Sequence, residues 1–137
     1  MHITLNLSDI NWLSVVAVTI LSFPLGAFWH SSILFGKTWK KDSKFRFDMS
    51  KKSNFIKLFA SAAVLHLITL AGLDMAVGLN ATAGSGFHTG LALSFLFTLP
   101  AIAATHLFPG RSWRLILIDA GFYLVLFTLA GAIFGIW

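Results

Sequence analysis

The chain has 137 residues, of which 57% are hydrophobic and only 11% are charged. Soluble domains carry about 25% charged residues. A water-soluble protein of this length would leave large apolar patches exposed, so the composition argues against a soluble protein and indicates an integral membrane protein. The sequence contains no cysteine, which excludes disulfides, thiolate metal sites and thiol catalysis.

Four apolar stretches are each long enough to cross about 30 Å of hydrocarbon, which takes about 20 residues in a helix. Membrane-spanning β-strands are shorter, at about 9–11 residues, and alternate in hydropathy, so these stretches are predicted to be helices. The predicted helices cover residues 11–35, 55–79, 87–108 and 113–137. We therefore expect an all-α, four-transmembrane-helix bundle that forms a single domain over residues 1–137.

The first helix leads into a basic connection over residues 36–54, which contains the run "KTWKKDSKFRFDMSKKSN". All ten Lys and Arg residues lie in or beside this connection and the one between the third and fourth helices. These two connections lie on the same side of a four-helix protein, and the positive-inside rule makes that side cytoplasmic. We expect both termini on the non-cytoplasmic side, in a multi-pass protein of the bacterial inner membrane.

The net charge of +5 is concentrated beside apolar helices, which favours anionic lipid head groups over nucleic acid as a partner. The interleaved aromatic and cationic residues predict either a surface segment that binds lipid head groups or a solvated loop that only sets topology. The candidate head-group residues are Lys37, Trp39, Lys40, Lys41, Lys44, Arg46, Arg111 and Arg114.

The second and third helices carry polar residues at two depths. His66 lies about 18 Å from the basic end of its helix, near the bilayer midplane, and a neutral imidazole bonded to a neighbouring helix is expected there. Asp74 lies near the outer end of the same helix, and His88 begins the next one. These two residues are predicted either to pair or simply to face the aqueous boundary.

Small residues recur at four-residue spacing in the second half of the chain. They are Gly86, Gly90 and Ser94 before the third connection, and Gly131 and Gly135 near the C-terminus. Such stripes allow two helix backbones to approach closely. The sequence leaves open whether they serve packing inside the bundle or contact with another protein.

A second group of polar residues is expected near the basic side of the membrane. His30 and Asp119 each lie about 9 Å deep by helical rise, and His106 lies near the end of its helix. Tyr123 follows Asp119 by one turn on the same face. Two histidines and a carboxylate at one level suit a metal ion or a proton relay. The alternatives are a hydrogen-bonded cluster that locks helices together, or side chains that simply reach the lipid head groups. The identity of any metal stays unknown, and no cofactor is strongly implied.

Four segments share a distinctive pattern of aromatic, glycine and basic residues: "INWLSVVAV" (10–18), "GAFWHSSILFGKTW" (26–39), "HLFPGRSWRLILIDAGFYLV" (106–125) and "GAIFGIW" (131–137). Together they resemble a bacterial family of small membrane proteins, the domain of unknown function numbered seventeen sixty-one. The chain departs from the usual family pattern at His30 and Phe122, where tyrosine is usual, and at Ser32, where proline is usual. The family has no assigned activity, so the resemblance implies fold and topology and no catalytic residue.

The sequence contains no Ser–His–Asp order, phosphate loop or metalloprotease motif, so no catalytic residue is assigned. Three functions remain in view. The first is an accessory or structural subunit that packs against other membrane helices in a larger complex or homo-oligomer. The second is a small proton- or ion-linked transporter that uses the intramembrane His and Asp residues. The third is a membrane protein with a His-bound metal or redox centre.

Overall fold

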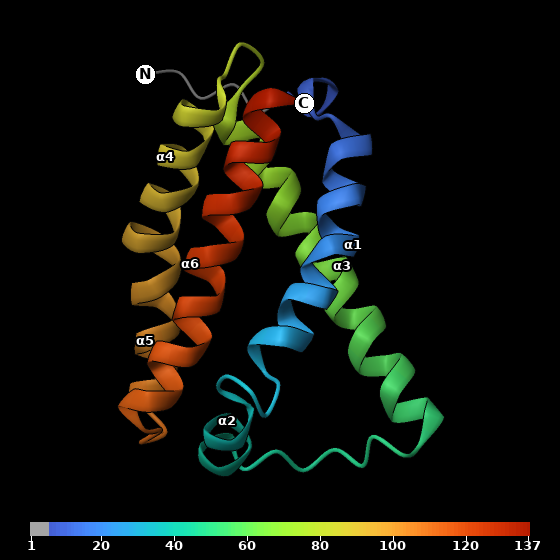
Figure 1. Cartoon of the computed structure of the whole chain (residues 1–137), viewed down its shortest axis with the longest axis vertical. Helices are drawn as coiled ribbons and strands as arrows, with labels where there is room; N and C mark the ends of the chain where they lie inside the picture. Colours follow the sequence, from blue (N-terminus) through green and yellow to red (C-terminus); the bar gives the residue numbers. More distant parts are fainter. Residues whose placement is uncertain (1–5) are drawn as a thin grey trace.

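The computed structural model describes residues 6–137, and the first five residues of the predicted outer N-terminus lie outside that range. Four helical spans are long and apolar enough to cross a membrane, which confirms the predicted all-α chain with four apolar helices (Figure 1). The spans are α1 (Trp12–Trp29), α3 (Lys52–Val77), the continuous helix α4–α5 (Ala83–Leu107) and α6 (Trp113–Ile136). The shorter elements are the 3₁₀ turn η1 (Leu7–Asp9) and helix α2 (Gly36–Ser43).

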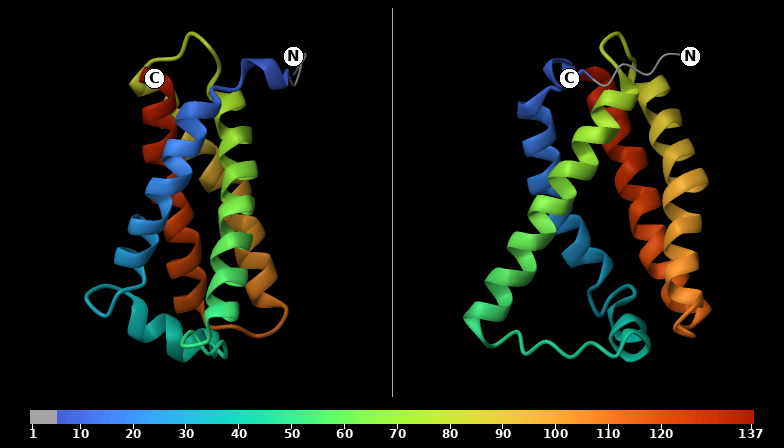
Figure 2. Two further views of the ribbon diagram at one scale, coloured as in Figure 1. Left: turned by 90° about the vertical axis from the view of Figure 1, so that its right-hand side faces the viewer. Right: turned by 180° about the vertical axis from the view of Figure 1, so that it is seen from behind.

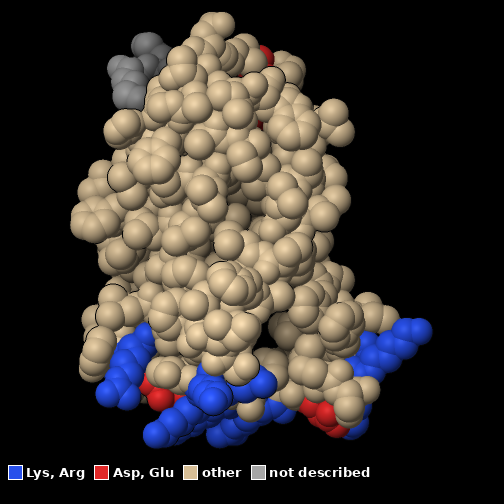
Figure 3. All heavy atoms as spheres, viewed as in Figure 1, with Lys and Arg blue, Asp and Glu red and all other residues tan. Residues whose placement is uncertain are grey.

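The spans alternate in direction, so the first described residues and the C-terminus lie at one end of the molecule (Figure 1). Helix α2 and the connections 44–51 and 108–112 lie at the opposite end, which we call the basic end. Figure 3 shows the Lys and Arg side chains gathered there and none along the apolar flank. The charge asymmetry of the sequence is therefore an asymmetry of the folded molecule.

The first span ends earlier than predicted, at Trp29 instead of residue 35, and α2 lies inside the predicted loop 36–54. The intervening turn is closed by backbone hydrogen bonds, including one of 2.9 Å from the Gly36 amide to the Ser31 carbonyl. A Cβ at Gly36 would lie 2.2 Å from the His30 carbonyl oxygen. The turn therefore requires glycine, and this close backbone approach leaves no signal in hydropathy.

The third span also differs at its start, since α4 begins at Ala83 and not at residue 87. Thr82 and Ser85 form a reciprocal capping box there, which satisfies backbone groups at the helix terminus. A π-helical turn, η2 (Ser94–Thr98), separates α4 from α5 (Leu99–Leu107). Pro100, which has no backbone N–H to donate, lies in the first turn of α5, directly after this wider turn.

Helix α3 is packed along only one half of its length. Its buried residues are Leu70, Ala71 and Leu73, which belong to the core with residues of α1 and α6. Toward the basic end α3 diverges from the other spans, as the right-hand view of Figure 2 shows. Phe55 and Ile56 in this half remain 48% and 51% exposed. The bundle is therefore tight at the end that holds the C-terminus and splayed at the basic end.

Helices α4 and α6 pack along the two stripes of small residues, and we call this contact the glycine seam. A Cβ on Gly86 would lie 2.0 Å from the Gly131 carbonyl oxygen, and one on Gly90 would lie 2.0 Å from that of Phe127. A Cβ on Gly135 would lie 2.1 Å from the carbonyl oxygen of Thr82. The glycines thus serve packing inside the chain, and Ser94 at the end of the stripe is buried.

Candidate functional site

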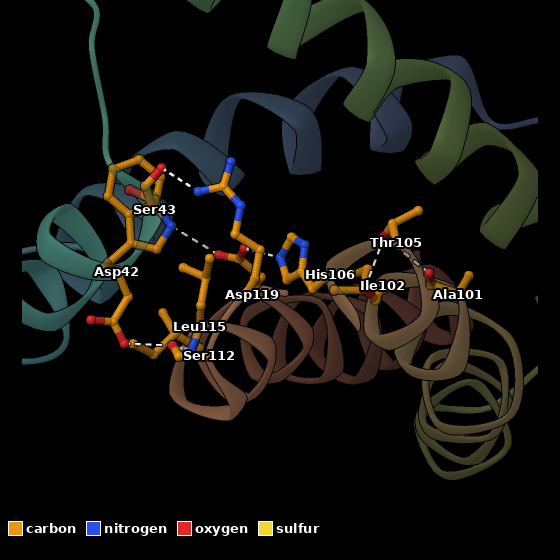
Figure 4. A network of polar contacts seen from close by, with 12 residues as sticks. Asp42, Ser43, Ala101, Ile102, Thr105, His106, Ser112, Leu115 and Asp119 are labelled. Carbon is orange, nitrogen blue, oxygen red and sulfur yellow. Dashed lines mark hydrogen bonds and ion pairs between the residues drawn. The ribbon is translucent and has the colours of Figure 1, made fainter. Parts of the chain in front are cut away.

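The first polar cluster centres on Asp119 of α6, near the basic end (Figure 4). One carboxylate oxygen lies 2.7 Å from Nε2 of His106 on α5, and the other accepts a 2.9 Å hydrogen bond from the indole N–H of Trp39 on α2. The side chains of Asp119 and His106 are each 24% exposed. The carboxylate thus joins three helices, and neither side chain is fully buried by the protein.

The chemistry of this cluster follows from its donors and acceptors. An ionised carboxylate only accepts hydrogen bonds, so His106 donates Nε2–H to Asp119. The imidazole has a second ring nitrogen, Nδ1, so a paired imidazole and carboxylate are chemically suited to proton transfer. The same bonds hold α2, α5 and α6 together, so the geometry also suits a purely structural role.

His30 lies beside this cluster without joining its hydrogen bonds. Its ring centroid is 5.1 Å from that of Trp39 and 5.8 Å from that of Phe122. Its Nδ1 lies 2.9 Å from the Gly26 carbonyl oxygen, within the last turn of α1. The structure therefore brings His106 and Asp119 into contact and separates His30 from them by the Trp39 ring.

The second polar cluster lies deeper and centres on His66 of α3. Its Nδ1 lies 2.8 Å from the Ser22 hydroxyl on α1, and its Nε2 lies 3.3 Å from the Tyr123 hydroxyl on α6. Ser22 uses its own proton to bond the Thr19 carbonyl at 2.6 Å, so it accepts from Nδ1–H. Tyr123 then donates to Nε2, and every polar group is satisfied with a neutral imidazole.

The sequence predicts that His66 has a hydrogen-bond partner on a neighbouring helix, but it does not identify Ser22 as that partner. A serine in an apolar helix is a weak signal, because its hydroxyl often bonds only its own backbone. Here the side chain is 2% exposed and faces another span. Two clusters therefore bridge three helices each, and their members Asp119 and Tyr123 are one turn apart on α6.

Asp74 and His88 have separate partners, so the predicted outer His–Asp pair does not form. A carboxylate oxygen of Asp74 accepts a 2.9 Å hydrogen bond from the backbone N–H of Asn11, the residue that caps α1. His88 Nδ1 lies 2.7 Å from the Gly84 carbonyl oxygen in its own helix. The turn between α3 and α4 places the two side chains against different backbone groups.

Helix α2 is attached to the basic end by polar contacts that the sequence did not reveal (Figure 4). Besides the Trp39 bond, the Ser112 hydroxyl donates to the Asp42 carboxylate, and the Arg111 guanidinium donates to the Ser43 carbonyl at 2.8 Å. Ser112 also caps α6 through a bond from the Leu115 amide. These contacts join residues that are 68 to 80 positions apart in the sequence, which no local pattern encodes.

The predicted head-group residues all lie at the basic end, on α2, on the two connections beside it and, for Arg114, in the first turn of α6. Lys44 and Arg46 follow α2, and Arg111 precedes α6.

Within residues 6–137, no three His, Cys, Asp or Glu side chains are grouped so as to hold a metal ion. Outside the spans, hydrogen bonds from the Ser50 hydroxyl and amide lower the pKa of the exposed Asp48 carboxyl.

Comparison with known proteins confirms the resemblance drawn from the motifs. No curated protein and no solved structure matches the chain. The family described as "Protein of unknown function (DUF1761)" matches residues 13–135, which includes all four spans almost entirely. The chain therefore belongs to the DUF1761 family.

Proposed function

We propose that this protein is a non-catalytic membrane subunit that packs against a transmembrane helix of another membrane protein. The observation that carries the proposal is the basic-end half of α3, which crosses an apolar region with no buried residue before Leu70. A membrane helix normally packs one face against its neighbours through small residues. Ala60 and Ser61 are small residues on this half of the helix, and both remain exposed.

The glycine seam limits which surface of the protein is open to contact with an external helix. Stripes of small residues are the usual contact surfaces between membrane helices, but those of α4 and α6 are already used inside the chain. In the part of the chain that the structure describes, the small residues Ala60 and Ser61 of α3 are exposed and leave room for an external helix. The partner is accordingly a helix with its own small or polar residues opposite Ser61.

The experiment is site-specific photo-crosslinking in the native membrane. A benzophenone amino acid at Ile56, on the splayed half of α3, should give a discrete crosslinked product whose mass identifies the partner. The matched control is Phe97 of η2, which is also apolar and 67% exposed but lies on the far side of the glycine seam. A discrete product from both positions, or from neither, would contradict the proposal.

The orientation belongs to the same proposal: the basic end faces the cytoplasm of the bacterial inner membrane. Its support is the concentration of Lys and Arg at one end, which the positive-inside rule interprets directly (Figure 3). Because the chain has no cysteine, single substitutions Lys41→Cys and Trp137→Cys provide clean probes. An impermeant maleimide should label only the Trp137→Cys variant in intact cells, and labelling of Lys41→Cys alone would reverse the orientation.

A second candidate function is proton-linked transport, and the spacing of the two polar clusters favours it. The His106–Asp119 pair and the His66–Tyr123 pair meet α6 one turn apart, so two histidines lie at successive depths below the basic end. If they move protons, Asp119→Asn should abolish proton flux in proteoliposomes while the fold remains intact. Asp9→Asn is the control, and equal flux in wild type and Asp119→Asn would exclude this function.

A further inference from the structure

A groove at the basic end lies where α2 turns into the following connection. It is lined by Trp39, Ser43, Lys44, Phe45, Arg46, Phe47 and Arg111. Three of these side chains are cations and none is acidic. The nearby Asp42 does not line the groove and accepts its hydrogen bond from Ser112. The groove therefore offers positive charge to an anion at the level where the spans end.

The aromatic wall of the groove is continuous. The Phe45 ring lies 5.4 Å from the Trp39 ring and 5.9 Å from the Phe47 ring, measured between centroids. Trp39 is itself fixed by its bond to Asp119. Aromatic rings of this kind sit at the level of lipid head groups in membrane proteins. Charge and apolar surface thus meet in one concave site.

The backbone at Lys44 shapes this site. Lys44 has a φ of 53°, in the left-handed region that glycine adopts most easily. This conformation ends α2 and turns residues 45–47 back beside Trp39. The backbone conformation at this position favours glycine, so the turn itself does not explain the lysine. The lysine side chain adds a cation to the groove.

Ser43 provides an independent observation. Its hydroxyl oxygen is buried and has no hydrogen-bond partner, although its carbonyl accepts from Arg111. A buried hydroxyl without a partner is uncommon in native proteins and calls for a ligand or another explanation. Ser43 lines the groove, so a rotation of its side chain would let a phosphate oxygen there accept that O–H together with N–H bonds from the neighbouring guanidinium groups.

We propose that this groove binds the phosphate of an anionic phospholipid head group. Lys44, Arg46 and Arg111 provide the charge, Ser43 provides a hydroxyl donor, and the aromatic wall contacts the glycerol and the first acyl carbons. The aromatic wall favours a lipid over free phosphate, because a free anion has no apolar part to bury there. This site is separate from the proposed helix contact on α3.

The test is native mass spectrometry of the full chain in mild detergent, titrated with phosphatidylglycerol or with phosphatidylcholine of the same acyl chains. Phosphatidylglycerol should bind the wild type more tightly. A basic residue near an anionic surface contributes on the order of 1 kcal/mol, so Arg46→Gln should weaken phosphatidylglycerol binding about fivefold. Lys57→Gln, which removes the same charge from an exposed position on α3 outside the groove, should change it less than about twofold. Equal effects of the two substitutions would overturn the proposal.

Two further measurements separate a ligand site from a merely unpaired hydroxyl. Ser43→Ala should weaken phosphatidylglycerol binding while circular dichroism shows an unchanged fold. If Ser43→Ala instead raises the thermal stability and leaves lipid binding unchanged, the hydroxyl is no ligand and the proposal fails. Millimolar inorganic phosphate should not displace the lipid, and full displacement would assign the groove to free phosphate.

Discussion

The glycine seam and the splayed basic half of the bundle are held together in opposite ways. At the seam, backbone meets backbone, and Gly90 leaves no room for even one methyl group beside the Phe127 carbonyl. At the basic half, α3 diverges and two polar clusters supply the cross-links, through Asp119 and through His66. The seam therefore depends on the absence of side chains, whereas the basic half depends on a few specific ones.

This difference indicates where the molecule tolerates change. A close contact between two backbones cannot relax without moving a whole helix. Membrane helices have no hydrophobic driving force between them, so a helix pair that loses its close packing gains nothing in return. A hydrogen bond between side chains is exchanged more easily, since the unfolded chain in a membrane also finds polar partners. We therefore expect the effect of single substitutions to fall from the seam, through the two clusters, to the exposed connection before α3.

The largest effect is expected at the seam. Gly90→Ala places a Cβ 2.0 Å from the Phe127 carbonyl oxygen, and overpacking of this kind costs about 3 kcal/mol of unfolding free energy. Reversible unfolding in detergent and denaturant mixtures, followed by tryptophan fluorescence, measures the loss. The control is Gly72→Ala on α3, where a Cβ meets nothing within 4 Å. Equal stability of the two variants would show that the seam is not close-packed.

A smaller effect is expected at the first cluster. Asp119→Ala leaves the Trp39 indole and the His106 imidazole without their acceptor, at a cost of about 2 kcal/mol. The loss should be local, so hydrogen exchange should increase over residues 36–43 while the amides of the seam stay protected. Asp9→Ala, at an exposed position, is the control. Unchanged exchange in α2 would mean that Asp119 does not hold this helix.

The same contrast explains what the sequence predicted and what it could not. The four spans follow from length and hydropathy, which the bilayer imposes directly. The end of α1 at Trp29 depends on the contact between Gly36 and the His30 carbonyl, and this contact exists only after the chain turns. The glycine stripes were recognised from spacing, but whether they pack internally depends on the rotation of each helix.

The sequence predicted the depth of the site residues along their helices but not which of them form hydrogen bonds with one another. Helical rise placed His106 and Asp119 near the same membrane level, and the structure joins them at 2.7 Å. The hydrophobic pattern does not define how each helix is rotated about its axis, because these spans are apolar on every side. The separation of His30 from His106 and Asp119 could therefore not be predicted. Trp39 entered the site from a segment predicted as a loop, since α2 is short and basic and has the composition of a connection.

The second cluster should contribute less than the first, because its bonds are between neutral groups. Tyr123→Phe removes the 3.3 Å contact to His66, and hydrogen bonds between membrane helices average about 0.6 kcal/mol. Ser22→Ala removes the contact on the other side of the imidazole. Because both act through one ring, a double-mutant cycle should show a coupling of at least about 0.5 kcal/mol. Strict additivity would mean that His66 does not link the two hydroxyls.

The smallest effect is expected in the connection before α3, where contacts are exposed to water. The Asp48 carboxylate accepts bonds from the Ser50 hydroxyl and amide, at 2.6 and 3.1 Å, and these bonds lower its pKa. A lowered pKa in the folded state means that the turn stabilises the charged carboxylate, so its contribution is present above the unfolded pKa and is lost as the pH falls through the folded one. Ser50→Ala should raise the pKa of Asp48 toward its ordinary value, which a carbon-13 NMR titration of the carboxyl group measures. Because the site is fully solvated, the unfolding free energy of the whole chain should hardly change, and a loss comparable to that of Tyr123→Phe would show that this turn also fixes the direction in which α3 leaves the bundle.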